Sequence, residues 1–353
     1  MITVIGPYPT KENEKDGMVR RVQKIDACFV GKKRQYLSVS FRGPLYKKKK
    51  INNEVTVFWM NFFLFWWYII YLCINSRIIY VHSIYNSLFI FPMYFFSKNI
   101  ITDMHGVVVE EIKINKNHNR ILILGGILVY KLIELIAVKR SMNIICVTNN
   151  MKKYFCEIYE IEPDKMRILP IFAERELIEK CDWGTPLRAI YSGGIQPWQC
   201  IDETIEFIKN TSQFFRWTIL SPNIKFFNSR LKDVEFKYGI EIKCVSPEEI
   251  GEYYKNSDLG LILRNDSIIN SVACPTKLID YLNYSILPIV KFPKIGDFYE
   301  SKYSFFYYYD AKNIINQHSK EELKKMSMNN KKILIYLMDQ ANDSIEWLKR
   351  VNN

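Results

Sequence analysis

The sequence predicts an α/β protein with two doubly wound domains, each built around a parallel sheet. Short apolar runs typical of buried strands alternate with segments of helical periodicity along almost the whole chain. Such alternation is typical of parallel sheets covered by helices on both faces. The alternation stops once, at residues 173–187 (AERELIEKCDWGTPL), a polar stretch with Gly and Pro that is typical of a linker.

The first half of the chain alternates between expected strands and helices from the N-terminus onward. The expected strands are ITVIG (2–6), YLSVSF (36–41), RIIYVHS (77–83), NIITDMHG (99–106), NIICVTNN (143–150) and MRILPIF (166–172). Helical periodicity predicts helices at 17–30, 55–74, about 85–96, about 121–140 and 150–160. We therefore expect an N-terminal domain over residues 1–172.

Alternation restarts after the linker and predicts a second domain over residues 187–328. The expected strands are RAIYSGG (188–194), FRWTILS (215–221), GIEIKCV (239–245), DLGLILR (258–264), LPIVKF (287–292) and FFYYYDA (305–311). Helices are expected at 198–209, 224–231, 246–257, 275–284 and 320–328, the third opened by a capping box of Ser246 and Glu249. A last helix, within 329–353, is expected to pack back on the N-terminal domain.

Residues 55–74 (VTVFWMNFFLFWWYIIYLCI) carry no charge over a length that could span a bilayer. Three interpretations compete: a transmembrane helix, a buried core helix, or a helix in the membrane interface, where Trp and Tyr are favoured. A spanning helix would place halves of one sheet on opposite sides of a membrane, because expected strands flank the segment. We therefore expect deep burial or contact with a membrane surface.

Composition narrows the classes of partner. The 353-residue chain is 48% hydrophobic and carries a formal net charge of +12, which suits anionic partners. No nucleic-acid-binding motif is present, and the run Lys47–Lys50 is interpreted as a solvated loop. The eight cysteines form no CxxC pair, as is typical of reduced thiols, and MITVIGPYP leads into a strand rather than a signal peptide. A cytoplasmic protein that binds no nucleic acid is expected.

Four unusual segments lie where the expected strands end, and ligands bind open parallel sheets at the carboxyl ends of strands. They are DGM (16–18), DMHGVVVEE (103–111), YSGGIQPWQCIDETIEF (191–207) and SVACPTKLIDYLNYSILPIV (271–290). In the third, a Gly-Gly pair separates a strand from a helix. Such a pair lets the backbone approach a ligand, and the N-terminus of the helix favours an anion.

In this order, the four segments resemble those of the retaining nucleotide-sugar glycosyltransferases of family 4 (group 1), which have the GT-B fold. The resemblance covers almost the whole chain and implies two Rossmann-like domains facing each other across a cleft. It implies a hexosyltransferase that moves a hexose from a nucleotide diphosphate sugar to a lipid-linked or polysaccharide acceptor in bacterial surface glycan (capsule or O-antigen) biosynthesis. Such an enzyme needs no cofactor or catalytic metal. It is expected at the inner face of the cytoplasmic membrane, attached peripherally.

The resemblance places the nucleotide-sugar donor on the second domain. A lysine in the first turn of a helix opposes the helix dipole, so Lys277 suits a phosphate better than it suits its helix. Asp280 would accept hydrogen bonds from the ribose hydroxyls, a task that needs an anion at fixed reach. The implied donor-binding residues are Gly193, Gly194, Arg264, Thr276, Lys277 and Asp280.

The resemblance places catalysis and acceptor binding on the first domain. His105 and Asp103 would form the catalytic pair, with His105 contacting the donor sugar or its developing charge. A lone His is more often structural, but His105 follows a strand end and precedes a glycine. Asp16, Gly17 and Arg20 would bind the acceptor. No cluster of metal ligands is evident from the spacing of the sequence.

Two departures from the family pattern leave alternatives open. The first acid of the family's Glu-x7-Glu pair is replaced by Val272, and Asp280 stands where the second is expected. Gln196, Trp198 and Gln199 lie near positions where the family often has Arg and Lys. A catalytically inactive sugar-nucleotide-binding module and a GT-B-like sugar-nucleotide epimerase are therefore the alternatives.

Overall fold

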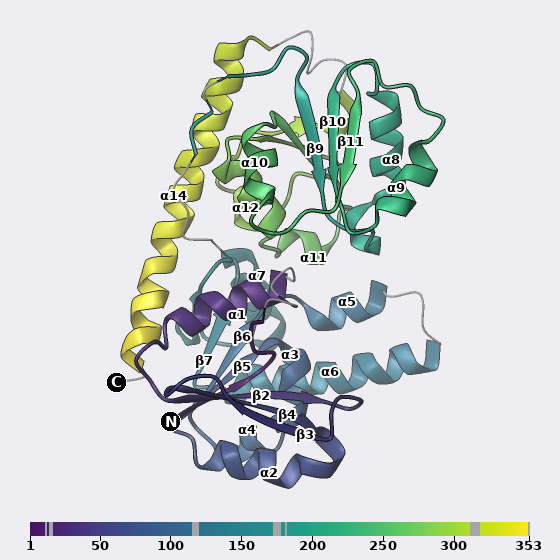
Figure 1. Cartoon of the computed structure of the whole chain (residues 1–353). Helices are drawn as coiled ribbons and strands as arrows, with labels where there is room; N and C mark the ends of the chain where they lie inside the picture. The colour runs from purple at the N-terminus through teal and green to yellow at the C-terminus, as the bar shows by residue number, and fades with distance from the viewer. Residues whose placement is uncertain are drawn as a thin grey trace. The chain divides into compact units, whose positions relative to one another are not determined.

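The computed structural model describes residues 1–10, 13, 17–114, 120–171, 178–180, 182–310 and 318–351. The chain forms two compact units (Figure 1). Unit 1 comprises Met1–Ile171 and Gln340–Asn353, and unit 2 comprises Phe172–Asp339. Asp16 and Cys181 lie outside the described residues, and the seven described cysteines are free.

Unit 1 contains an eight-stranded sheet in the order β3-β4-β2-β1-β5-β6-β7-β8 among the residues described. Every neighbouring pair is parallel except β3 and β4, which are antiparallel. The strand order reverses direction at β1, where β2 lies on one side and β5 on the other. The strands are β1 (Ile2–Ile5), β2 (Arg34–Ser40), β3 (Tyr46–Lys50), β4 (Val55–Asn61), β5 (Ile78–His82), β6 (Ile100–Met104), β7 (Asn143–Cys146) and β8 (Met166–Ile168).

Helices connect the parallel strands of unit 1, as right-handed crossovers require. They are α1 (Gly17–Ala27), α2 (Phe62–Ile74), α3 (Ser83–Ser87), η1 (Leu88–Ile90), α4 (Met93–Phe96), α5 (Val108–Ile114), α6 (Arg120–Arg140), α7 (Asn149–Tyr159) and η2 (Pro163–Lys165). Among the described helices, α6 alone is long and apolar enough to cross a membrane. Ile133, Ala137 and Val138 near its C-terminal end are buried, and α6 connects β6 to its neighbour β7.

Unit 2 contains a six-stranded, all-parallel sheet in the order β11-β10-β9-β12-β13-β14, counted over its described residues. This is the strand order of dinucleotide-binding Rossmann domains, and its direction reverses between β9 and β12. The strands are β9 (Arg188–Ser192), β10 (Arg216–Leu220), β11 (Ile240–Lys243), β12 (Leu259–Ile262), β13 (Leu287–Val290) and β14 (Phe306–Tyr307). Their apolar side chains form a core that includes Trp217, Phe215 and Phe227.

The helices of unit 2 follow the same alternation. They are η3 (Pro197–Gln199), α8 (Ile201–Asn210), α9 (Ile224–Leu231), α10 (Ile250–Lys255), α11 (Ile268–Ser271), α12 (Thr276–Asn283), η4 (Gly296–Phe298) and η5 (Tyr308–Asp310). The chain continues in α14 (Lys320–Val351), one continuous helix where two were expected. From Gln340 onward α14 belongs to unit 1, where its Gln340 side chain bonds Asn149 and its Trp347 ring stacks under Arg167.

The apolar segment 55–74 divides into a strand and a helix, so its interpretation as one helix is wrong. Residues 55–61 form β4, and α2 begins directly afterwards, where the Asn61 side chain accepts a hydrogen bond from the Phe63 amide. The side-chain period changes from that of a strand to that of a helix at Asn61, but the segment is apolar throughout and shows neither period. Lys47–Lys50 form the exposed edge strand β3 rather than the loop expected, and the expected helix at 85–96 is divided into α3, η1 and α4.

Candidate functional site

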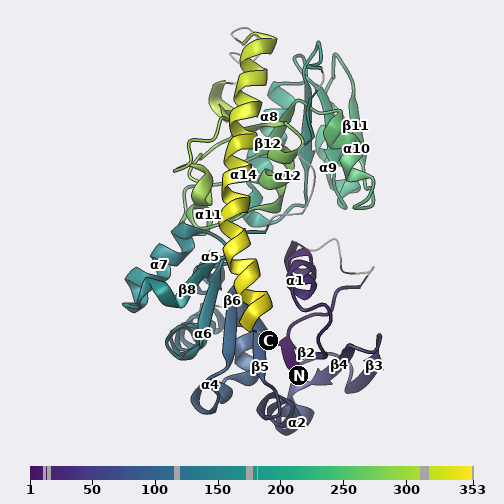
Figure 2. The same ribbon diagram turned by 90° about the vertical axis from the view of Figure 1, so that its left-hand side faces the viewer.

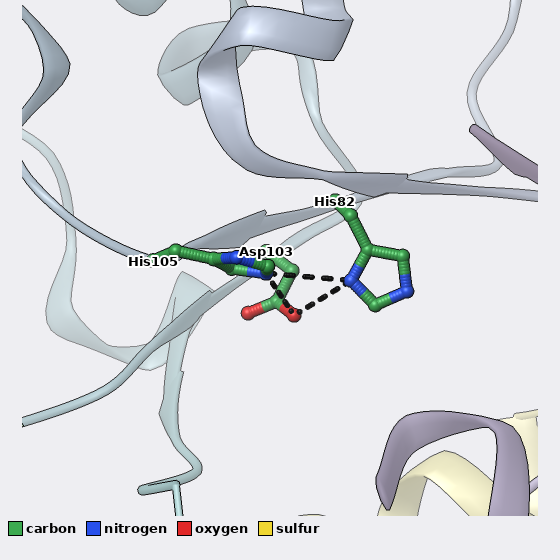
Figure 3. A group of neighbouring side chains, drawn as sticks. All are labelled: His82, Asp103 and His105. Atoms are coloured by element: carbon green, nitrogen blue, oxygen red, sulfur yellow. Dashed lines mark hydrogen bonds and ion pairs between the residues drawn. The ribbon is translucent and has the colours of Figure 1, made fainter. Parts of the chain in front are cut away.

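Three side chains converge at the carboxyl ends of β5 and β6 in unit 1 (Figure 3). His82, the last residue of β5, is paired in register with Asp103 of β6, and His105 follows β6 directly. Asp103 Oδ2 lies 3.0 Å from His105 Nε2 and 3.3 Å from His82 Nδ1, and the two ring nitrogens are 3.3 Å apart. Gly6, after β1, leaves room for the His82 side chain, because a Cβ on Gly6 would lie 3.1 Å from His82 Cβ.

Arg21 of α1 completes this cluster from the opposite side. Its guanidinium donates to both carboxylate oxygens of Asp103, with Nε 3.0 Å from Oδ1 and 2.9 Å from Oδ2, and Nη1 donates to the Leu169 carbonyl at 2.6 Å. Arg21 and Asp103 are both buried. The bidentate geometry is the strong form of an Arg–carboxylate pair. It fixes α1 to β6 and explains why α1 begins where the sequence predicted an acceptor loop.

The electrostatics of the cluster follow from burial and from Arg21. Burial alone would raise the pKa of Asp103, but the Arg21 guanidinium and the neighbouring His105 outweigh it and hold that pKa well below its usual range. Burial lowers the pKa of His82 to about 4, so His82 is neutral at pH 7. An ionised carboxylate can only accept hydrogen bonds. The nitrogen of His105 that faces Asp103 therefore carries the proton, which orients the ring.

The three side chains offer ligand atoms within 4.8 Å of one another, a spacing that a metal ion could bridge. The sequence did not reveal this cluster because His82 comes from a different strand. Both oxygens of Asp103 already accept hydrogen bonds from Arg21, whose charge opposes a second cation. The cluster is therefore better suited to hold the His105 imidazole in one orientation than to bind a metal. Among the described residues, His105 Nδ1 and His82 Nε2 are the buried ring atoms of this cluster without a hydrogen-bond partner.

The predicted acceptor residues are only partly described. Gly17 is the first residue of α1, and Arg20 lies half-buried one turn later. Asp16 lies outside the described residues. The neighbouring Arg21 is paired with Asp103. The side-chain type alone could not distinguish the two arginines, although Arg21 lies between the buried Val19 and Val22.

Unit 2 has its own candidate site, at the point where the strand order reverses between β9 and β12. Gly193 follows β9, and a Cβ placed on it would lie 2.7 Å from Lys277 Nζ and 2.9 Å from Gln199 Oε1. Any side chain here would displace the lysine. Glycine at position 193, the first of the predicted Gly-Gly turn, therefore allows a side chain to lie close to the backbone. In this structure that side chain is Lys277.

The position of Lys277 is set by the packing of α12 on the sheet. The Tyr281 ring lies so close to β12 that a Cβ on Gly260 would meet it at 2.4 Å. The Tyr281 hydroxyl reaches the Ser192 amide at 3.3 Å and the Leu261 carbonyl at 3.4 Å, linking β9 to β12. The first turn of α12, which carries Lys277, is thereby fixed beside Gly193.

Two cations, Lys277 and Arg264, lie at this site without a carboxylate partner. Across the described ranges neither forms an ion pair or a side-chain hydrogen bond, and Lys277 Nζ instead lies 4.3 Å from the centre of the Tyr191 ring. Burial, reinforced by the charge of Arg264, lowers the pKa of Lys277 to about 7. Burial also lowers the pKa of Arg264 to about 10, so it stays charged at neutral pH. Both side chains are half-buried, and a half-buried cation without a partner is stabilised by an anionic ligand.

The residues around the glycine turn form a neutral hydrogen-bonded chain. The Tyr191 hydroxyl lies 2.6 Å from both the Gly194 carbonyl and Gln199 Oε1, and Gln199 Nε2 donates to Gln196 Oε1 at 2.7 Å. These glutamines stand near where the resembled family has cations, and here they shape the turn. Trp198 is exposed beside them.

The remaining predicted donor residues lie on α12 or just before it. Thr276 is the first residue of α12, whose N-cap, Pro275, makes no side-chain capping bond. Asp280 lies one turn further and is buried. Val272, at the position of the missing first acid, is buried. The structure thus brings Gly193, Lys277 and Arg264 together.

Comparison with known proteins gives a fold and no family. No protein-family model matches the chain, and no curated protein matches it. Three solved structures are similar over their whole length. Anabaena HepE in complex with UDP and glucose has a TM-score of 0.68 at 10% identity, covering 99% of both chains. OtsA in its apo form has 0.65 at 10% identity, covering 98% of both.

The third similar structure is a UDP-forming α,α-trehalose-phosphate synthase from Burkholderia vietnamiensis, with a TM-score of 0.64 at 9% identity, covering 99% of this chain and 98% of that one. The chain has the GT-B fold. The predicted fold class is therefore confirmed. Identities this low carry no residue-level conclusion, so the predicted site residues stay predictions.

Proposed function

We propose that the chain is a glycosyltransferase that binds a nucleotide diphosphate sugar on unit 2. The observation that carries this proposal is the pair Lys277 and Arg264, two half-buried cations without a carboxylate partner among the described residues. They lie beside a glycine turn at the reversal of a Rossmann strand order, where such sheets bind dinucleotides. A diphosphate supplies the missing negative charge.

The similar structures support the choice of ligand class. One of them, HepE, was solved with UDP and glucose, and another is a UDP-forming synthase. A third, pneumococcal GtfA, is an O-GlcNAc transferase solved with UDP and GlcNAc, which this chain covers over 65% of its length. We infer that the donor nucleotide here is a nucleoside diphosphate and that the transferred group is a hexose.

In this proposal, one set of side chains stabilises the leaving diphosphate and another stabilises the sugar. Lys277 and Arg264, with the amides after Gly193, would stabilise the diphosphate as it departs, which is electrostatic catalysis by preorganised donors. Asp280 would bind the ribose hydroxyls. His105, held in one orientation by Asp103, would stabilise the charge that develops on the sugar. No protein nucleophile is needed if the leaving phosphate and the acceptor use the same face of an oxocarbenium-like sugar, which yields retention.

The acceptor and the setting of the reaction are inferred from the family 4 resemblance. We infer a lipid-linked or polysaccharide acceptor in bacterial surface glycan assembly, bound near Gly17 and Arg20 with Asp16. The enzyme would work in the cytoplasm, attached peripherally to the inner membrane. The exposed apolar side chains of α2 and α6 support that attachment.

The test is incubation with a panel of sugar nucleotides, a lipid-linked acceptor fraction and a scintillation readout of transferred sugar. We expect release of free nucleoside diphosphate together with a product that keeps the anomeric configuration of the donor, read from NMR coupling constants. An inverted product would contradict the family 4 assignment. Release of an altered sugar nucleotide without transfer would identify an epimerase.

A catalytically inactive sugar-nucleotide-binding module remains the second candidate, favoured by one observation. Val272 fills, with a buried apolar side chain, the position where the resembled family has its first acid. Such a module would bind a nucleotide sugar with the affinity of an enzyme and turn over none of it. The panel separates the two, because binding without turnover of any donor would favour the module.

A further inference from the structure

Unit 1 exposes a continuous apolar surface on three helices. The term apolar face is used here for the exposed side chains Phe63, Leu64, Trp66, Trp67, Tyr71 and Ile74 of α2, Phe95 and Phe96 of α4, and Ile121, Leu122, Leu124, Leu128, Val129 and Leu132 of α6. Residues of α4 contact both α2 and α6, so the three helices adjoin (Figures 1 and 2). Soluble monomers rarely leave so many large apolar side chains together in water.

The side chains of the apolar face are largely exposed. Phe96 is 82% exposed, Ile121 is 75% exposed, and Trp66 and Trp67 are 56% and 57% exposed. The opposite side of each longer helix is packed on unit 1, with Ile69 and Leu72 buried on α2 and Ile133 and Ala137 on α6. Each helix is therefore anchored by one side and presents the other.

Cations border this face. Tyr46, which begins the lysine strand β3, packs its ring 5.2 Å from Phe65 and 6.4 Å from Tyr68 of α2. Strand side chains alternate between faces, so Lys48 and Lys50 share this side of β3 with Tyr46, and Lys48 lies 5.3 Å from the Phe58 ring. At the other end, the Arg140 guanidinium lies 5.7 Å from the Phe95 ring. The arrangement is an apolar centre with a basic rim.

Acidic side chains are missing from the segments that build the face. Residues 55–102 contain no Asp or Glu, and α6 contains only Glu134, which is buried and bonded to the Tyr159 hydroxyl. Burial raises the pKa of Glu134 to about 7. Acids do lie beside these segments, at Glu54 before β4 and at Glu110 and Glu111 of α5, which contacts α6, so the rim is mainly basic. A mainly basic rim matches an anionic lipid surface.

We propose that the apolar face docks unit 1 onto an anionic lipid bilayer, with α2, α4 and the first half of α6 in the interface and the lysines of β3 at the headgroups. Trp and Tyr on α2 are the residue types that favour this boundary. The helices would lie in the membrane plane instead of crossing it, because α2 is packed against unit 1 by Ile69 and Leu72, and α6 is held there by the buried residues of its C-terminal part. The inference concerns unit 1 and does not depend on the donor site of unit 2.

The first test is flotation of the full chain with vesicles. Wild-type protein should float with vesicles of phosphatidylglycerol and phosphatidylethanolamine at about 50 mM salt, and release as the salt is raised tenfold. Trp66→Glu with Trp67→Glu, and separately Leu124→Glu with Leu128→Glu, should each lower vesicle binding about tenfold or more. Lys48→Ser with Lys50→Ser should lower binding about fivefold per lysine on anionic vesicles only.

Matched control variants lie on α14. Ile335→Glu with Tyr336→Glu changes side chains that are 45% and 57% exposed outside the face, and Lys324→Ser with Lys325→Ser removes two exposed lysines. Both should float like wild type. Circular dichroism verifies folding, and Trp66→Ser with Trp67→Ser replaces the glutamate pair if that pair does not fold.

Three outcomes would overturn the proposal. They are wild-type protein that stays unbound to anionic vesicles, equal losses in face and control variants, or equal binding to purely phosphatidylcholine vesicles. A stable dimer that the Trp66 and Trp67 changes dissociate, with vesicle binding unaltered, would assign the face to a second copy. Titration of UDP into the same variants separates the proposals, since membrane-defective variants should keep wild-type UDP affinity.

Discussion

Both units place charged side chains at the carboxyl ends of parallel strands, but the charges are paired in unit 1 and lack a carboxylate partner in unit 2. In unit 1, the buried carboxylate of Asp103 is fully paired, with Arg21 on one side and two imidazoles on the other. In unit 2, the charge of Arg264 acts on Lys277, and neither side chain has a carboxylate partner among the residues described. The first site is complete within the chain, and the second needs an anion from outside.

The difference indicates which cluster is structural and which is a binding site. A buried, bidentate ion pair becomes part of the fold, and removal of one partner leaves the other charge uncompensated. Two unpaired cations lower the stability of the free protein, and such a cost persists in proteins where function requires it. We therefore interpret the paired cluster as a support for His105, and the unpaired cluster is the one that we propose binds a ligand.

The largest expected effect is on stability, and it has opposite signs in the two units. Arg21→Met should destabilise unit 1 by about 3–5 kcal/mol, because Asp103 stays buried without its partner. Lys277→Met should leave unit 2 of the free protein as stable or more stable, because it removes a desolvated charge. Hydrogen exchange at the amides of β6 and β9 reports each unit separately. Equal protection at β6 in wild-type and Arg21→Met protein would contradict the comparison.

The next effect is on catalysis. His105→Ala should lower kcat about 10²-fold and raise KM less, because the contact matters most as charge develops on the sugar. His318→Ala, which changes a partly exposed histidine of unit 2, is the control and should keep wild-type rates. Steady-state transfer kinetics measure both. A fully active His105→Ala enzyme would move the catalytic centre away from the end of β6.

The smallest effect is the pH dependence that follows from Lys277. Its pKa falls from 10.5 to about 7 on folding, so between these values the unfolded chain binds the extra proton and stability rises with pH. A bound diphosphate raises that pKa again, so UDP binding above pH 7 should take up close to one proton. UDP affinity should then weaken as pH rises from 7, by up to about tenfold per pH unit.

Calorimetry in two buffers of different ionisation enthalpy measures this proton uptake. Lys277→Met should abolish it. Lys291→Met is the matched control, because Lys291 is already paired with Glu203 at 2.8 Å. Uptake that survives in Lys277→Met protein would show that another group titrates.

Much of the fold was predictable because strand and helix periods differ. The alternation gave the two parallel sheets, and the glycine turn at Gly193 was predictable because close approach requires a residue without a Cβ. The boundary at Asn61 was not, because an entirely apolar segment shows neither period. The apolar surface of α6 was not predicted either, because only the helix itself, at about 121–140, was expected there.

The contacts of Asp103 with Arg21 and His82 could not be predicted from the sequence, for a different reason. His82, Asp103 and Arg21 come from β5, β6 and α1, and only the parallel register of His82 with Asp103 brings them together. No spacing along the chain encodes that contact. Lys277 was accessible to prediction because a lysine in the first turn of a helix is anomalous by itself.

The central claim is that the unpaired cations of unit 2 bind a diphosphate, and titration calorimetry with UDP tests it most directly. Wild-type protein should bind UDP, and Lys277→Met and Arg264→Met should each lose about 1.5–3 kcal/mol, or roughly 10- to 150-fold in affinity, while Lys291→Met binds as wild type does. The same loss in Lys291→Met would show only a general effect of charge. Undiminished UDP affinity in both Lys277→Met and Arg264→Met would contradict the account.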